Sequence, residues 1–229
     1  MNLIKGNNVT LGLNVVIGNN VVIYDDVVIG DNVRIDDNVV LGKLPMKSIN
    51  SAVTTLKPLP PLEIGSNCIV GSGAIIYRGS KIKDGCLVAD LATIRENVLI
   101  GEKTIVGRGV AIENECSVGS KCKLETNAYI TAYSIIEDGV FVAPNVSTSN
   151  DNFVGRTKDR FKHFKGVVAR RGSRIGVGAI ILPGIELGED CLVAAGSLVT
   201  KNVPAKKIVM GVPAIIFRDV PDEQLLKNQ

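Results

Sequence analysis

The stretch that decides the fold covers residues 64–142, and it reads IGSNCIVGSGAIIYRGSKIKDGCLVADLATIRENVLIGEKTIVGRGVAIENECSVGSKCKLETNAYITAYSIIEDGVFV. An aliphatic side chain returns at every sixth position, from Ile64 to Val142. The residue four places after each of these positions is small or β-branched, as at Cys68. Self-similarity at a fixed six-residue period indicates a repeat architecture, and hexapeptide repeats are typical of β-helices.

The same period extends over most of the chain. It runs through residues 11–41 before the decisive stretch and through residues 175–199 after it. Aromatic residues make up 4% of the sequence and tryptophan is absent, which suits a narrow interior filled by aliphatic side chains on short strands. The sequence therefore predicts one all-β solenoid over residues 1–220. A short helix over residues 221–229, with Asp222 as its N-cap, is expected to block the open end.

The charge and hydropathy of the chain argue against several classes of partner. A net charge of +3 is too small to indicate nucleic-acid binding, and lysine and arginine are spread along the sequence. No basic and apolar leader precedes the repeat, because MNLIKGNN runs directly into it, and no apolar run could span a bilayer. We therefore expect a cytoplasmic protein with neither a nucleic-acid nor a membrane partner.

The five cysteines are expected in the core. Each stands four places after an aliphatic position of the period, in the slot that valine, alanine, serine and threonine fill elsewhere. Three hexads make one triangular coil in this architecture, so Cys68 and Cys86 should stack at about 4.8 Å. A disulfide between them is possible but not expected in the cytoplasm. Inward thiols on a packed axis cannot converge on zinc, and we expect no metal.

Two interruptions of the repeat are the places where function is expected, because rigid scaffolds carry function on their loops. The first spans about residues 43–63 and is rich in proline, lysine, serine and threonine. The second spans about residues 148–168 and holds the only histidine, His163, and the run Asn150-Asp151-Asn152. The alternative for either loop is a tolerated insertion on an outer corner of the solenoid.

Residues 170–214 carry a resemblance to a known family. They read RRGSRIGVGAIILPGIELGEDCLVAAGSLVTKNVPAKKIVMGVPA, which resembles the C-terminal part of hexapeptide-repeat acyltransferases. These enzymes form left-handed parallel β-helices. The resemblance implies the same fold here, with two loop excursions, and a homotrimer with active sites between subunits. It also implies that acetyl-CoA, or another short acyl-CoA, is the co-substrate and lies between neighbouring helices across the last coils.

The residue types in these last coils suit that co-substrate. Small residues let a pantetheine arm lie against the backbone, and basic residues could meet the coenzyme's phosphates. The small residues are Gly178, Ala179, Ala195 and Gly196, and the basic residues are Arg171, Lys201, Lys206 and Lys207. The alternatives are tight packing between coils for the small residues and a solvated surface role for the basic ones.

Many members of the superfamily use a histidine base from the corresponding long loop, and His163 is the one candidate here. Flanking lysines would depress the pKa of its imidazole and favour the neutral form. His163 lies late in the loop, however, close to the point where the coils resume. A single histidine also excludes the carbonic anhydrases built on this fold, which need three histidines for each zinc ion.

A closer resemblance covers the middle of the chain. The strings PLPPLEIG, AIIYRG, ADLATIRE, VAIEN, TNAY and SNDN are similar to those of N-acyltransferases that act on nucleotide-linked amino-dideoxy sugars, such as the enzyme for dTDP-4-amino-4,6-dideoxyglucose. It implies that Asp90 and Glu113 face the sugar, and that the first loop and neighbouring turns hold the nucleotide. The other residues expected at the substrate are Tyr77, Arg95, Asn127, Tyr129, Asn150, Asp151 and Asn152.

Ion pairs are the alternative explanation for the two carboxylates. Glu113 stands one coil from Arg95, and Asp90 stands one coil from Arg108. Because exposed pairs contribute only about 0–1 kcal/mol, stability alone is a weak reason to place them. We prefer a hydrogen bond to the sugar amine or hydroxyl for Asp90.

The expected chemistry is attack by an unprotonated sugar amine on the acyl-CoA thioester carbonyl, with a backbone N–H stabilising the oxyanion. The departing thiolate can take the proton, so no strong base is obligatory, and the scarcity of histidine favours N-acylation. An O-acetyltransferase that uses His163 as its base is the enzymatic alternative. A non-catalytic trimeric scaffold is the other.

Overall fold

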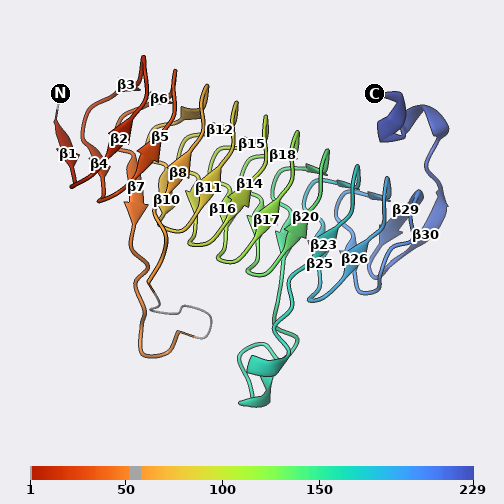
Figure 1. The fold of residues 1–229 in the computed structure, drawn as a ribbon. Helices are drawn as coiled ribbons and strands as arrows, with labels where there is room; N and C mark the ends of the chain where they lie inside the picture. The colour runs from red at the N-terminus through yellow and green to blue at the C-terminus, as the bar shows by residue number, and fades with distance from the viewer. Residues whose placement is uncertain (1, 52–57) are drawn as a thin grey trace.

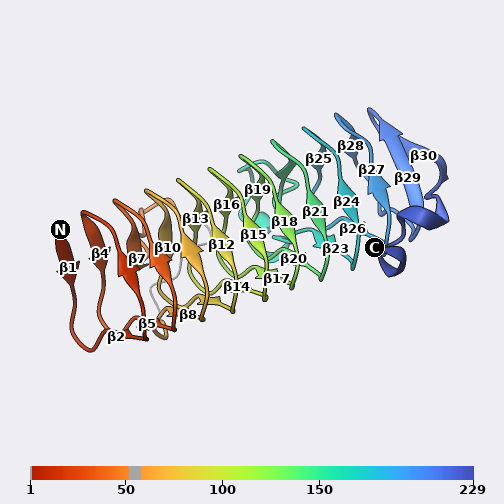
Figure 2. The same ribbon diagram turned by 90° about the horizontal axis from the view of Figure 1, so that it is seen from above.

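The computed structural model describes residues 2–51 and 58–229, and these form one three-sided β-solenoid (Figure 1). Its short strands lie in three parallel sheets, here called A, B and C, and successive strands visit the sheets in turn. The left-handed parallel β-helix expected from the sequence is confirmed. Seen from above, the coils follow one another along a single axis (Figure 2).

Sheet A holds ten strands in spatial order. They are β1 (Leu3–Lys5), β4 (Val21–Ile23), β7 (Val40–Lys43), β10 (Ile75–Tyr77), β13 (Thr93–Ile94), β16 (Ala111–Ile112), β19 (Tyr129–Ile130), β22 (Ser147–Thr148), β25 (Ile180–Ile181) and β28 (Leu198–Val199). Sheet B holds nine. They are β2 (Thr10–Leu11), β5 (Val28–Ile29), β8 (Glu63–Ile64), β11 (Lys81–Ile82), β14 (Leu99–Ile100), β17 (Ser117–Val118), β20 (Ile135–Ile136), β23 (Val168–Ala169) and β26 (Glu186–Leu187).

Sheet C holds eleven strands. They are β3 (Val16–Ile17), β6 (Arg34–Ile35), β9 (Ile69–Val70), β12 (Leu87–Val88), β15 (Ile105–Val106), β18 (Lys123–Leu124), β21 (Phe141–Val142), β24 (Arg174–Ile175), β27 (Leu192–Val193), β29 (Lys207–Gly211) and β30 (Ala214–Asp219). The last pair, β29 and β30, is antiparallel and forms a hairpin at the end of the solenoid.

The register explains the six-residue period. Thr93 pairs with Ala111 and Ala111 pairs with Tyr129, so residues 18 apart stack on successive coils. The aliphatic positions point inward, and Ile94 and Ile112 are fully buried. All five cysteines are buried in the same core as free thiols, as the inward slot predicts.

The turns between sheets follow the same period. One residue in each turn has a left-handed backbone, as Asn97 does at φ 58°, which explains the frequent asparagine and glycine there. A second turn position often holds an aspartate whose Oδ1 accepts the backbone N–H of the residue one coil earlier. In the described part of the chain six aspartates do this: Asp25, Asp31, Asp37, Asp84, Asp90 and Asp138.

Both long loops leave from the same corner of the prism, where sheet A turns into sheet B (Figure 1). This A–B corner carries the first loop between β7 and β8 and the second between β22 and β23. The second loop contains one turn of 3-10 helix, η1 (Asp159–Lys162). A cluster of corner residues therefore lies on the coils between the two loops.

The C-terminal segment differs from the expected capping helix. It forms two 3-10 turns, η2 (Asp222–Gln224) and η3 (Leu226–Asn228), and Pro221 instead of Asp222 occupies the N-cap. The segment lies along the B–C corner, because the left-handed Gly139 and Gly172 leave a notch that Leu226 fills. It therefore covers a side of the solenoid. No helix in the described ranges is long and apolar enough to cross a membrane.

Candidate functional site

The polar side chains between the two loops come from successive coils of the A–B corner. Tyr77 ends β10, Arg95 and Glu96 follow β13, and Glu113 follows β16. Because these strands stack at about 4.8 Å, the four side chains form one continuous cluster. Three of the six residues predicted at the substrate or the reaction centre between the two loops share this corner: Tyr77, Arg95 and Glu113.

Arg95 is the fixed centre of the cluster. Its Nε lies 2.9 Å from Oε2 of Glu96 and its Nη2 lies 3.0 Å from Oε1, which is a two-point ion pair. Its Nη1 lies 3.5 Å from Oε2 of Glu113, and its Cζ lies 5.1 Å from the centre of the Tyr77 ring. The vertical Arg95–Glu113 pair expected from stacking is present, but Glu96 is the tighter partner.

Glu96 is a residue that the sequence reasoning missed. Its side chain is only 5% exposed, although it stands in a turn between two polar residues. A buried carboxylate that accepts hydrogen bonds from one arginine through both oxygens holds the guanidinium in a single orientation. The signal in the sequence was the Arg-Glu pair itself, which the six-residue pattern does not require.

Glu113 has an altered protonation equilibrium. Burial raises the pKa of its carboxyl above the ordinary value, Arg95 opposes that rise, and the charge of Glu96 adds to it. Burial, followed by the charge of Glu113, likewise raises the pKa of the Tyr129 phenol. Glu113 is therefore a better proton acceptor than an exposed glutamate.

A pocket of about 210 Å³ opens beside Glu113 under the second loop. Its lining residues are Glu113, Tyr129, Thr131, Ala132, Asn150, Asp151, Arg160 and Phe164. Four of these were predicted at the substrate or the reaction centre from the sequence. The structure brings together Glu113, Tyr129, Asn150 and Asp151, although they come from three segments of the chain.

Asp151 has a structural task in this pocket. Its carboxylate accepts the backbone N–H groups of Phe153 and Gly155, both at 2.9 Å, and pairs with Arg160 at 2.8 Å. These bonds fold the start of the second loop back over the pocket. Asn152, which was also predicted at the substrate, is exposed and does not line the pocket.

His163 lies outside the pocket. Its side chain is 55% exposed, and its Nε2 lies 3.1 Å from Oδ2 of Asp159. Its ring packs against Phe153, with 5.6 Å between the ring centres. Within one chain no contact links this imidazole to Glu113 or Tyr129 among the described residues.

Asp90 and Asn127 lie on a different corner, where sheet C turns into sheet A. Asp90 belongs to the series of turn aspartates, and its Oδ1 accepts the N–H of Ser72 at 2.9 Å. Within the described ranges it makes no ion pair with Arg108. Asn127 occupies a left-handed turn position at φ 59°. A single chain therefore does not bring Asp90 to Glu113.

The small residues predicted at the coenzyme lie in two different environments. Gly178 and Gly196 stack on the C–A corner with left-handed backbones and open space beside their Cα atoms, and Ala195 is exposed there. Ala179, by contrast, is fully buried in the core, because it fills an inward slot. Its buried side chain agrees with the alternative given above, tight packing between coils, and the coenzyme contact expected for Ala179 stays a prediction.

The four basic residues do not form one cluster within the chain. Lys201 lines a pocket of about 320 Å³ beside the β29–β30 hairpin. Arg171 lies on the B–C corner, 3.9 Å from Glu189, and Lys207 is paired with Asp219. Lys206 is exposed near the end of the solenoid. Arg171 lines a different pocket of about 290 Å³, beside β17 and β20, so the basic residues do not share one pocket.

Two family models match the chain. One, described as bacterial transferase hexapeptide (six repeats), matches residues 8–43. The other, hexapeptide repeat of succinyl-transferase, matches residues 61–89, 92–120 and 171–201. The chain belongs to the hexapeptide-repeat transferase superfamily.

Curated relatives of this hexapeptide-repeat protein are similar over short stretches. A serine acetyltransferase of Buchnera aphidicola is 38% identical over 90 residues, which is 39% of this chain and 33% of the relative. A 2,3,4,5-tetrahydropyridine-2,6-dicarboxylate N-acetyltransferase of Staphylococcus aureus is 40% identical over 55 residues, or 24% and 23% of the two chains. The match to these relatives thus spans a third or less of their length.

Among solved structures, the Francisella novicida UDP-N-acetylglucosamine acyltransferase superposes with a TM-score of 0.57 at 18% identity. The superposition covers 98% of this chain and 71% of that chain. At this identity the likeness concerns the fold of the hexapeptide-repeat protein alone.

Proposed function

We propose that the protein is an acyl-CoA-dependent N-acyltransferase that transfers an acetyl or short acyl group to the amine of a nucleotide-linked amino-dideoxy sugar, with dTDP-linked sugars as first candidates. The observation that carries this proposal is Glu113, a half-buried carboxyl of raised pKa beside a pocket that no histidine lines. An amine acceptor needs only a mild hydrogen-bond acceptor, whereas a hydroxyl acceptor needs a base more urgently. Curated relatives include a galactoside O-acetyltransferase and an N-acetyltransferase.

Glu113 has a defined role in this proposal. Its carboxylate accepts a hydrogen bond from the sugar amine and orients the nitrogen lone pair toward the thioester carbonyl. The C–N bond forms as the C–S bond breaks, and the proton lost by nitrogen passes to the departing thiolate. Arg95, locked by Glu96, keeps the Glu113 carboxylate in place.

Tyr129 and Asn150 are proposed to bind the sugar. Both line the pocket, and Asn150 stands at the start of the second loop. Tyr77 and Lys43 lie at the side of the cluster nearer the first loop, where the Lys43 Nζ is 5.4 Å from the centre of the Tyr77 ring. This side suits the nucleotide, because the Lys43 ammonium can meet a phosphate. The Tyr77 ring is 8% exposed and packs beside Arg95, so it supports this side from within.

The outer face of sheet A supports a homotrimer. The residue at the central outward position is uncharged on each of the ten strands, and the charged strand residues Lys5 and Lys43 stand at strand ends, next to the A–B corner. The uncharged residues are Ile4, Val22, Val40, Ile75, Thr93, Ala111, Tyr129, Ser147, Ile180 and Leu198. Sheets B and C each present charged residues, such as Lys81 and Arg34. An uncharged face is the natural surface to cover with a second copy.

This face lies between the C–A and A–B corners. Packing it against a neighbour would bring the C–A corner of one subunit toward the A–B corner of the next. Asp90 would then approach the pocket of the neighbouring subunit, and Gly178 and Gly196 would border the cleft proposed for acyl-CoA. Asp90 is therefore proposed as a second acidic contact to the sugar, through the carboxylate oxygen that does not hold the turn.

An O-acetyltransferase remains the alternative, because the Asp159 carboxylate orients the His163 ring at 3.1 Å. A thiol-release assay with acetyl-CoA distinguishes the two, using dTDP- and UDP-linked amino sugars beside the same sugars with hydroxyl in place of amine. Release with an amine and not with its hydroxyl partner supports the proposal. Release with the hydroxyl partner supports the alternative, and a protein that neither releases thiol nor binds coenzyme A is a scaffold.

A further inference from the structure

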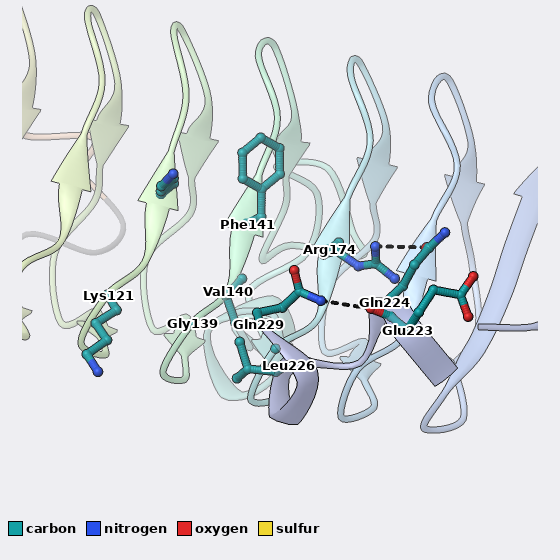
Figure 3. A pocket seen from close by; sticks show the side chains of 11 residues that line it. Lys121, Gly139, Val140, Phe141, Arg174, Glu223, Gln224, Leu226 and Gln229 are labelled. Carbon is teal, nitrogen blue, oxygen red and sulfur yellow. Dashed lines mark hydrogen bonds between the residues drawn. The ribbon is translucent and has the colours of Figure 1, made fainter. Parts of the chain in front are cut away.

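A second cavity lies away from the A–B corner, between the C-terminal segment and sheet C. Its volume is about 460 Å³. Figure 3 shows the side chains that line it. One wall is the outer face of β18, β21 and β24, and the other is formed by η2 and η3. The resemblance to acyltransferases assigns nothing to this pocket.

The C-terminal wall is held in place by specific contacts. Leu226 fills the notch above Gly139 and Gly172, and its backbone N–H donates to Oδ1 of Asp190 at 2.9 Å. Nη1 of Arg174 donates to the side-chain oxygen of Gln224 at 3.1 Å (Figure 3). These contacts hold the C-terminal segment against sheet C, so both walls of the pocket are fixed.

The wall formed by sheet C presents a cation, an aromatic ring and a second cation in a row. Lys123 pairs in register with Phe141, and Phe141 pairs with Arg174. Strand stacking sets these side chains about 4.8 Å apart, so the Phe141 ring lies between two positive groups. Lys121 adds a third cation from the B–C corner, against one carboxylate from Glu223.

Arg174 has unmet hydrogen-bonding capacity. Its Nε and Nη2 are buried and have no hydrogen-bond partner in the described part of the chain. A charged group whose buried donors are unpaired is poorly compensated. Together with Lys121 and Lys123, Arg174 gives the pocket a positive potential that attracts anions.

We propose that this pocket binds a small phosphorylated molecule with a flat ring, of the nucleoside monophosphate class. The phosphate lies against Lys121 and Lys123, and the ring packs on Phe141, on the side toward Arg174. Glu223 limits the site to a single phosphate group by repelling a longer polyanion. The proposal does not depend on the acyl transfer, because the pocket lies on sheet C and the B–C corner.

Calorimetric titration of the full chain tests the proposal with three probes: AMP, adenosine and inorganic phosphate. We expect AMP to bind. Adenosine and phosphate should each bind at least about tenfold more weakly, because adenosine keeps only the ring contact and phosphate keeps only the contacts to the cations. Lys123→Gln should weaken AMP by about tenfold. Phe141→Leu should weaken AMP and adenosine but leave phosphate unchanged.

Lys121→Gln has a matched control in Lys103→Gln. Both lysines occupy the same left-handed turn position at φ 56°, one coil apart on the B–C corner, but only Lys121 lines the pocket. Lys121→Gln should weaken AMP, and Lys103→Gln should not. Failure of AMP to bind, or equal affinity in the Lys123→Gln and wild-type proteins, would overturn the proposal. Displacement of AMP by coenzyme A would make the pocket part of a donor site and overturn its independence.

Discussion

Glu96 forms a two-point ion pair with Arg95. Nε of Arg95 lies 2.9 Å from Oε2 of Glu96, and Nη2 of Arg95 lies 3.0 Å from Oε1. The pair is set against the Tyr77 ring on one side and the Glu113 carboxylate on the other. It thus links the proposed nucleotide side of the A–B corner to the proposed reaction centre.

Glu96→Gln should lower the melting temperature and reduce kcat/KM together. Removing one charge from a buried pair costs about 3–5 kcal/mol, because the remaining charge is left uncompensated. The matched control is Lys81→Gln, which breaks the exposed pair between Lys81 and Glu63 at 2.8 Å. That change should cost about 0–1 kcal/mol and leave turnover unaffected. Equal decreases in melting temperature for the two variants would contradict this role of Glu96.

Glu113 should make the folded protein less stable as the pH rises. Its folded-state pKa lies above the ordinary 4.5, so between these two values the folded state binds more protons than the unfolded state. The contribution is therefore most favourable below the ordinary value and is lost as the pH rises through the raised one.

Melting temperatures of wild type and Glu113→Gln, measured across this range, isolate the effect, because other groups titrate alike in both proteins. The stability of wild type relative to the variant should fall with rising pH. A relative stability that rises with pH would show that the carboxylate is stabilised and not desolvated in the folded protein.

Thr93→Lys should break the trimer. Thr93 points outward at the centre of the uncharged face of sheet A, and a charge buried in a subunit contact is strongly unfavourable. Ser117→Lys is the matched control, because Ser117 is a similarly half-exposed outward residue on sheet B. Light scattering after size exclusion should show a smaller assembly for Thr93→Lys only. A trimer that survives Thr93→Lys would place the subunit contact elsewhere.

Asp90→Asn separates a sugar contact from a turn contact. The asparagine side-chain oxygen can still accept the Ser72 N–H, so the turn should keep its fold and its melting temperature. Asp84 makes the same bond to Ser66, also at 2.9 Å, on another corner. If Asp90 contacts the sugar, kcat/KM falls in Asp90→Asn and not in Asp84→Asn. Equal activity in the two variants would leave Asp90 as a turn residue.

The period of the sequence predicts the coils, the buried cysteines and the stacking of residues 18 apart, because each hexad has to place two side chains on one narrow axis. The same arithmetic places Arg95 and Glu113 on one corner. It also separates Asp90 from Glu113, since 23 positions are not a multiple of 18, and this consequence could have been drawn from the sequence.

Three other features depend on packing that the six-residue period does not encode. The burial of Glu96 depends on the side-chain packing of one turn, which a pattern of residue types does not encode. The second loop folds over the pocket through the bonds of Asp151 to Phe153, Gly155 and Arg160, which no repeat determines. The placement of the C-terminal segment depends on the notch at Gly139 and Gly172, far earlier in the chain.

The most direct test of the central claim is kcat/KM for an amino-sugar acceptor in wild type, Glu113→Gln and His163→Asn. Removing a group that orients the acceptor lowers the rate by about 10²-fold. The account predicts such a loss in Glu113→Gln and near wild-type turnover in His163→Asn. Loss in His163→Asn with retained activity in Glu113→Gln would contradict it and establish the histidine as the base.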